Sequence, residues 1–252
     1  MLNTILHGEP TDLPPLLIAH GLYGSARNWG VIAKRLSDER QVIAVDMRNH
    51  GSSPRAASHT YADMAGDLAD VIAAHGGQMD VLGHSMGGKA SMMLALNHAE
   101  ALRKLVVADI APVAYGHSQI QFIEAMRKVD LNSISRRSEA QEQLAGAGVD
   151  PALQSFFTQS LDLPGKRWLL NLDALADQMP NIMSFPQTDA AWHGSALFLS
   201  GAASDYVLPE HRPLVKARFP NARFAKIPGA GHWLHAEKPR EFEAAVRAFL
   251  NA

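Results

Sequence analysis

The feature that most constrains this chain is the segment Gly83-His84-Ser85-Met86-Gly87, which lies between an apolar run at 79–82 and a helix-compatible stretch. Glycines placed two residues before and after a serine let a strand and a helix approach closely, because neither carries a Cβ atom. The serine hydroxyl is then presented above the sheet edge, near the positive end of the helix that starts at about Met86. The segment predicts a serine nucleophile at a strand-to-helix turn; the alternative is a glycine-rich turn with an incidental serine.

Composition limits the class of protein. With 252 residues, 47% of them apolar and 19% charged, the chain is expected to be a soluble globular protein with one large α/β domain, or a core with an inserted subdomain. A formal net charge of −2 without a basic face argues against a nucleic-acid partner. The lack of cysteine excludes disulfides, thiolate metal sites and cysteine nucleophiles. We find no membrane-spanning apolar run and no signal-peptide pattern, so we expect a cytoplasmic protein.

Short apolar segments alternate with amphipathic ones along most of the chain, which is typical of an α/β fold whose mostly parallel sheet carries helices on both faces. We predict strands at 16–19, 41–45, 79–82, 105–108, 196–199 and 223–227, with an additional edge strand at 4–6. Helices are predicted at 29–36, 61–75, 86–98, 210–218 and 239–250. Thr60 and Asp63 are expected to cap the helix at 61–75.

The alternation breaks between 111 and 193, an interval too long for a loop and too irregular for a β-α unit. It contains helix-like pieces at 119–129, 138–145 and 151–159 and several large apolar side chains. We interpret 111–193 as a helical lid inserted into an α/β core formed by 1–110 and 194–252. The alternative is two ordinary crossover helices with long loops.

A serine hydroxyl is a weak nucleophile at neutral pH and needs a base. Among twelve histidines, His232 is the best candidate. It follows the last predicted strand and precedes the final helix, which places it at the same sheet edge as Ser85. A histidine on a surface loop is the alternative. Its neighbour Trp233 is expected to contact the substrate.

Other histidines are assigned lesser roles. His84 is expected to pack or to position its neighbours, and His20 to brace loop backbone. Five more are expected at the surface: His7, His59, His75, His98 and His211. His232 and His235 form an H-x-x-H pair, but no carboxylate-rich partner set follows it, so we expect no metal and no other cofactor.

Backbone donors for an oxyanion are predicted from two segments. His20-Gly21-Leu22-Tyr23-Gly24-Ser25 follows a predicted buried strand and is expected to aim the Leu22 amide at the site. Met86, next to the nucleophile, is expected to supply the second amide. The alternative for the first segment is a plain glycine-rich turn.

Several motifs together resemble the α/β-hydrolase superfamily. They are His20-Gly21 with Gly24-Ser25, Asp46-Met47-Arg48-Asn49-His50-Gly51-Ser52-Ser53-Pro54, Gly83-His84-Ser85-Met86-Gly87-Gly88, and Gly231-His232-Trp233. The 46–51 segment, Asp109-Ile110-Ala111-Pro112-Val113 and the stretch 231–239 narrow the resemblance to the YbfF-like esterases. It runs from about 20 to 250 and is loosest in the predicted lid. Asp46 and Arg48 are expected to tie loop backbone near the site.

The acid that orients His232 has two candidates. In most members of the superfamily an aspartate lies three residues beyond the glycine that ends a late strand. Here Ser204 takes that place after Gly201, and Asp205 lies one residue later. Asp109 ends the strand after the nucleophile helix and reaches the same edge, and the resemblance also favours it. We predict Asp109, with Asp205 as the alternative.

These residues predict hydrolysis of a carboxylic ester or acyl thioester through an acyl-enzyme, with a small-molecule substrate. Two other functions stay open. A C–C bond hydrolase or cofactor-free lyase would need basic side chains facing the substrate, for which the interval offers Arg127, Lys128, Arg136, Arg137 and Lys166. A ligand sensor with slow turnover is the third. The sequence gives no oligomeric state.

Overall fold

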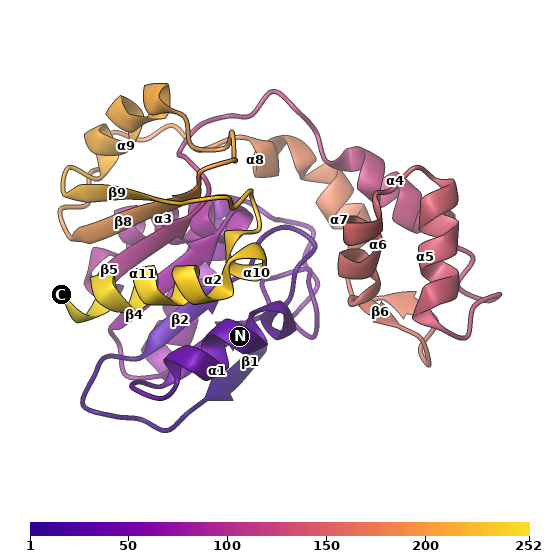
Figure 1. Cartoon of the computed structure of the whole chain (residues 1–252), viewed down its shortest axis with the longest axis horizontal. Helices are drawn as coiled ribbons and strands as arrows, with labels where there is room; N and C mark the ends of the chain where they lie inside the picture. The colour runs from indigo at the N-terminus through magenta and orange to yellow at the C-terminus, as the bar shows by residue number, and fades with distance from the viewer.

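The computed structural model describes residues 1–252 and contains a seven-stranded sheet in the order β1-β3-β2-β4-β5-β8-β9 (Figure 1). Only β1 runs antiparallel to its neighbour. The strands are β1 (Thr4–His7), β2 (Leu16–Ala19), β3 (Val42–Val45), β4 (Met79–His84), β5 (Leu102–Ala108), β8 (Ser195–Gly201) and β9 (Ala222–Ile227). All residues of β2, β3 and β4 are buried, as expected for parallel strands covered on both faces. The predicted α/β fold is confirmed.

Helices cover both faces of this sheet. One face carries α1 (Gly30–Leu36), α10 (Leu234–Glu237) and α11 (Pro239–Asn251), which pack their apolar side chains with those of alternate strand positions. The other carries α2 (Tyr61–Ala74), α3 (Met86–Asn97) and α9 (Arg212–Arg218). Three short 3₁₀ turns join these elements: η1 (Ala26–Trp29), η2 (Ala99–Ala101) and η3 (Pro209–His211). Two cores therefore lie on opposite faces and hold the sheet between them.

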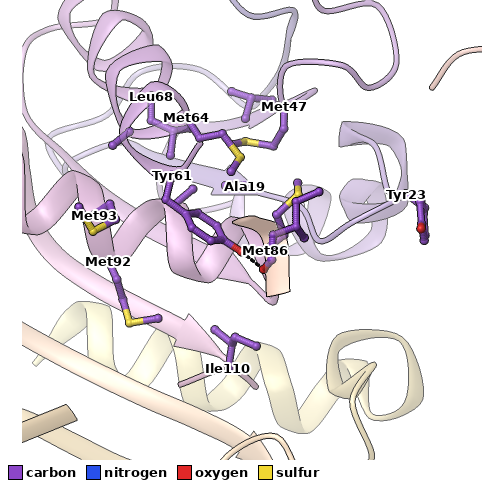
Figure 2. Close-up of a cluster of buried hydrophobic side chains, with 14 of the residues drawn as sticks. Ala19, Tyr23, Met47, Tyr61, Met64, Leu68, Met86, Met92, Met93 and Ile110 are labelled. Carbon is purple, nitrogen blue, oxygen red and sulfur yellow. Dashed lines mark hydrogen bonds between the residues drawn. The ribbon is translucent and has the colours of Figure 1, made fainter. Parts of the chain in front are cut away.

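The α2 helix illustrates how sequence produces this packing. Thr60 caps it, because its hydroxyl oxygen accepts a hydrogen bond from the Asp63 amide at 3.2 Å. Its buried face contributes Met64 and Leu68, which lie beside the methionines of the neighbouring elements (Figure 2). Unbranched thioether side chains fill irregular gaps well, and the core on this face of the sheet includes Met47, Met64, Met86, Met92 and Met93.

The segment between β5 and β8 stands apart from the sheet (Figure 1). We call residues 111–193 the insert. It contains α4 (Ile120–Lys128), α5 (Arg137–Gly146), α6 (Pro151–Thr158), α7 (Leu172–Asp177), α8 (Met179–Met183) and a small hairpin of β6 (Leu161–Asp162) and β7 (Arg167–Trp168). The first three helices match the predicted pieces within two residues. The hairpin and the two last helices were not predicted, because each is too short to show a periodic pattern.

Candidate active site

Ser85 occupies the turn between β4 and α3. Its backbone has φ 52° and ψ −119°, a conformation that a residue with a Cβ atom adopts only under constraint. A Cβ atom on Gly83 would overlap the Gly87 carbonyl, and one on Gly87 would overlap the Ala19 carbonyl of β2. The two glycines are therefore needed for the close approach of strand and helix that exposes the hydroxyl.

His232 and Asp109 continue from this serine in one hydrogen-bonded chain. His232 Nε2 lies 3.1 Å from Ser85 Oγ, and His232 Nδ1 lies 2.8 Å from Asp109 Oδ2. Asp109 follows β5 and is fully buried. Because its carboxylate can only accept, the imidazole carries its proton on Nδ1 and leaves Nε2 free to accept the serine proton.

The Asp109 carboxylate has hydrogen-bond partners besides the histidine. Asp109 Oδ1 accepts the Gly201 amide at 2.9 Å, and Oδ2 also accepts the Ser204 hydroxyl. Asp205 is exposed and makes no hydrogen bond to His232. The structure thus brings Asp109 to the imidazole, while the residue in the more usual place, Ser204, bonds to that same carboxylate.

Two aromatic neighbours of the site were not identified from the sequence. The Tyr206 ring stacks on the His232 imidazole with 3.9 Å between centroids and a 20° interplanar angle. The Tyr115 hydroxyl donates to the Tyr206 carbonyl at 2.8 Å and accepts the Ala111 amide at 3.0 Å. These contacts link residues far apart in the chain, so no local sequence pattern predicts them.

The segment after β2 packs directly against Ser85. Gly24 donates its amide to the Gly21 carbonyl at 3.0 Å, which closes a tight turn around Leu22. A Cβ atom on Gly21 would lie 3.1 Å from the Ser85 Cβ atom. The Leu22 amide has no acceptor within the protein, and Met86, as the first residue of α3, lacks an intrahelical acceptor. Both predicted oxyanion donors are therefore available next to Ser85.

Two buried histidines support this turn. His20 donates Nδ1–H to the Gly21 carbonyl at 2.7 Å and accepts the Met47 amide on Nε2 at 2.9 Å. His50 accepts the Tyr23 amide on Nε2 at 3.1 Å. Burial lowers the pKa of His20, and lowers that of His50 well below its usual value. Each imidazole stays neutral, which it must do to accept a backbone N–H.

The prediction for His59 was wrong. Its side chain is fully buried, with Nδ1 3.2 Å from Asn49 Nδ2 and Nε2 3.3 Å from Met86 Sδ. Burial lowers the pKa of His59 to about 3. The sequence around it is polar and gives no periodic signal, so only the tertiary contact with the first residue of α3 shows its place beneath the site.

Asp46 and Arg48 tie loop backbone as expected. Asp46 accepts the Ala26 amide on Oδ1 at 2.8 Å and the Ser52 amide on Oδ2 at 2.9 Å. Arg48 pairs with Asp67 of α2, with 2.9 Å between Nη2 and Oδ1. These contacts anchor the loop that carries His50.

The histidines next to the catalytic candidates differ in their partners. His84 Nε2 donates to the His232 carbonyl at 2.9 Å and so helps to position the loop that carries His232. His235 stacks on Trp29 with 4.2 Å between centroids, and its buried Nδ1 has no hydrogen-bond partner. Burial lowers the pKa of His235 to about 3. Trp233 remains 36% exposed at the cavity.

A cavity of about 340 Å³ opens onto Ser85 and His232. The insert supplies much of its apolar wall: Phe122, Leu153, Phe156, Phe157, Ile182 and Met183. Trp233 and the Leu22 turn line it from the core side. Cavities of this size with a few convergent polar groups are typical of small-molecule sites.

Lys89 is the one lysine or arginine that lines the cavity. It is 1% exposed and donates to the carbonyls of Met183 at 3.2 Å and Ser184 at 2.6 Å, with its ammonium 4.7 Å from the Tyr115 ring centroid. Burial lowers the pKa of Lys89 to about 7. The side chain joins α3 to the end of α8.

The family model described as "Alpha/beta hydrolase family" matches residues 16–245. This chain belongs to the α/β-hydrolase family. The Escherichia coli K12 protein "Esterase YbfF" is 40% identical over 247 residues, covering 94% of this chain and 93% of that protein. The mouse "sn-1-specific diacylglycerol lipase ABHD11" is 39% identical over 257 residues, covering 98% of this chain and 83% of that protein.

The solved structures agree. "Marine microorganism esterase" superposes with a TM-score of 0.93 at 38% identity and covers 98% of each chain. This α/β hydrolase is therefore an enzyme of the esterase class, related to YbfF, which confirms the resemblance read from its motifs. None of its helices has the length and apolar character required to cross a membrane.

Proposed function

We propose that this α/β hydrolase cleaves carboxylic esters or acyl thioesters through an acyl-enzyme on Ser85, with His232 as base and Asp109 as the orienting acid. The observation that carries the proposal is the hydrogen-bonded chain Ser85–His232–Asp109 at the floor of an apolar cavity. Each link has the donor and acceptor that the chemistry requires.

In the acylation step, Ser85 Oγ attacks the substrate carbonyl carbon while His232 Nε2 takes the hydroxyl proton. The carbonyl π electrons move to oxygen, and the Leu22 and Met86 amides stabilise that charge. When the intermediate collapses, the bond to the leaving oxygen or sulfur breaks and His232 returns the proton to it. Asp109 stabilises the imidazolium throughout.

In the deacylation step, water takes the place of the leaving group. His232 accepts a proton from that water, the hydroxide attacks the acyl carbon, and the second intermediate releases the carboxylic acid and restores the Ser85 hydroxyl. The reaction requires no redox change and no group beyond the side chains and amides named.

The insert supports an acyl chain as the recognised part of the substrate. We propose that residues 111–193 act as a lid over a core formed by 1–110 and 194–252, because the aromatic side chains of α4 and α6 form a wall of the cavity. Trp233 lies at the cavity next to His232 and would contact the leaving group. Apolar walls favour hydrocarbon over charged substituents.

Basic side chains that a C–C bond hydrolase or lyase would use face elsewhere. Arg127 pairs with Asp173, Arg136 with Glu139, and Arg137 with the Thr158 and Leu161 carbonyls. Lys128 is exposed, and Lys166 bonds to the Ile134 carbonyl. None of the five lines the cavity, so none of them supports this alternative; Lys89, the basic side chain that does line it, is bound by the Met183 and Ser184 carbonyls.

A panel of p-nitrophenyl esters of increasing chain length tests the proposal. We expect turnover that rises with chain length until the cavity is filled, and that is abolished in Ser85→Ala. Equal activity of Ser85→Ala and the wild type would contradict the proposal. Tight binding of ester analogues with no Ser85-dependent turnover would favour a ligand sensor.

A further inference from the structure

Tyr23, the residue after the proposed oxyanion donor Leu22, has a backbone φ of 64°. The hydrogen bond between the Gly24 amide and the Gly21 carbonyl makes Tyr23 the third residue of a four-residue turn. A positive φ at that position is normally taken by glycine or asparagine, since a larger side chain brings its Cβ atom close to the backbone. The conformation persists only if surrounding contacts hold it.

On the core side, the contact made by Tyr23 itself is with His50. The Tyr23 amide donates to His50 Nε2 at 3.1 Å, and His50 in turn bonds through Nδ1 to the Arg48 carbonyl at 2.9 Å. This hydrogen bond sets the orientation of the peptide group between Leu22 and Tyr23.

On the other side, all the partners of Tyr23 belong to the insert. Its hydroxyl donates at 2.8 Å to the carbonyl of Gln119, which is the N-cap residue of α4. Its ring meets Phe157 of α6 edge-on, with 5.4 Å between centroids and an 83° interplanar angle. Its carbonyl accepts the Ser160 hydroxyl at 3.4 Å. The side chain is only 3% exposed, so the insert covers it almost completely.

Tyr61 provides a comparison within the same molecule. Its hydroxyl also donates to an insert carbonyl, that of Ile182, at 2.6 Å, but Tyr61 stands on the regular helix α2 (Figure 2). Figure 2 shows Tyr23 at the edge of the cluster, to one side of Tyr61. A tyrosine can bind the insert from a regular helical backbone, as Tyr61 does. Hydrogen bonding to the insert therefore does not by itself explain the positive φ of Tyr23.

We propose that Tyr23 is a positioning residue that couples the seating of the insert to the direction of the Leu22 amide. With the insert seated, its three contacts hold Tyr23 at positive φ and the turn presents Leu22 to the oxyanion. When the insert moves away, Tyr23 loses those contacts, the turn relaxes, and the oxyanion site is incomplete. This inference rests on the proposed function, because it needs Leu22 as a donor.

Tyr23→Phe tests the coupling by removing only the hydroxyl. We expect kcat for a p-nitrophenyl ester to fall about tenfold, less than the roughly 10²–10³ for complete loss of one oxyanion donor, with KM nearly unchanged. The affinity for a trifluoromethyl ketone, which forms an oxyanion on Ser85, should fall by the same factor. The affinity for the product carboxylic acid should not change.

Tyr23→Ala removes the ring and hydroxyl contacts to the insert but keeps a Cβ atom, so the positive φ stays strained without the contacts that hold it. We expect lower kcat and weaker trifluoromethyl ketone binding than in Tyr23→Phe. Tyr23→Gly also deletes the contacts but accepts the positive φ without cost, so it should recover ketone affinity relative to Tyr23→Ala.

Arg55→Met is the matched control. Arg55 is an exposed residue outside the insert, and its guanidinium donates to the Trp168 carbonyl of the insert at 2.9 Å. The substitution therefore removes a contact with the insert that does not involve the turn at Tyr23. It should retain wild-type ketone affinity.

The outcomes are distinct. Parallel losses of kcat and ketone affinity in Tyr23→Phe and Tyr23→Ala, absent in Arg55→Met, support the coupling. Wild-type kcat and ketone affinity in Tyr23→Ala overturn it, as does an equal loss in Arg55→Met or a Tyr23→Gly that binds the ketone no better than Tyr23→Ala. If Ser85→Ala retains turnover, the proposed function itself fails; an inactive Ser85→Ala beside an unaffected Tyr23→Ala leaves that function intact and rejects only the coupling.

Discussion

Asp109 Oδ2 lies 2.8 Å from His232 Nδ1, and the other oxygen of the same fully buried carboxylate accepts the Gly201 amide. This pair determines which imidazole nitrogen faces Ser85. We expect Asp109→Asn to lower kcat by about 10⁴, because an asparagine N–H directed at the ring favours the wrong tautomer. Steady-state kinetics at neutral pH measure it. The matched control is Asp205→Asn, which should stay within a fewfold of wild type; the reverse order would assign the acid to Asp205.

Gly87 is needed for packing as well as for the turn. A Cβ atom there would overlap the Ala19 carbonyl of β2, a buried backbone atom that cannot move aside cheaply. We expect Gly87→Ala to lower the free energy of unfolding by about 1–3 kcal/mol in urea denaturation. Gly66 lies inside α2 with nothing within 4 Å of an added Cβ, so Gly66→Ala should instead stabilise by about 1 kcal/mol. Equal effects of the two substitutions would disprove this account of the turn.

His59 should make the protein sensitive to acid. Burial lowers its pKa from 6.5 to about 3 in the folded state, so between these values the unfolded chain binds more protons. Its contribution is therefore intact above pH 6.5 and is lost as the pH falls toward 3. The unfolding free energy of the wild type should decline faster below pH 6.5 than that of His59→Gln, by up to about 1.4 kcal/mol per pH unit. Parallel profiles in denaturant titrations would show that His59 does not titrate this way.

Lys89 should make the stability of the protein depend on pH in the alkaline range. Burial lowers its pKa from 10.5 to about 7, so the folded state sheds a proton that the unfolded chain keeps between those values. Stability should therefore rise with pH from 7 toward 10 in the wild type, relative to Lys89→Met. Denaturation at pH 7, 8 and 9 measures the difference in unfolding free energy between the wild type and Lys89→Met. If the wild type instead loses stability relative to Lys89→Met as the pH rises, the Met183 and Ser184 carbonyls stabilise Lys89 as the cation.

Much of the site could be predicted because its signals are local. The spacing around Ser85 and the position of His232 after the last strand follow from sequence order in a parallel sheet, where carboxyl ends share one edge. The stacking of Tyr206 on His232 and the burial of His59 against Met86 could not, because they depend on contacts between distant segments. The positive φ of Tyr23 belongs to the same class, since the residues that contact its side chain lie in an insert about a hundred residues away along the chain.

The central claim is that Ser85 becomes acylated during turnover, and a slowly deacylating p-nitrophenyl carbamate tests it most directly. Peptide mass spectrometry after the reaction locates the modified residue, while released p-nitrophenolate counts the sites. We predict one equivalent of p-nitrophenolate, a carbamoyl group on the peptide that contains Ser85, and neither in Ser85→Ala. A carbamoyl group on another residue, or full ester hydrolysis by an enzyme that carries the group on Ser85, would contradict the account.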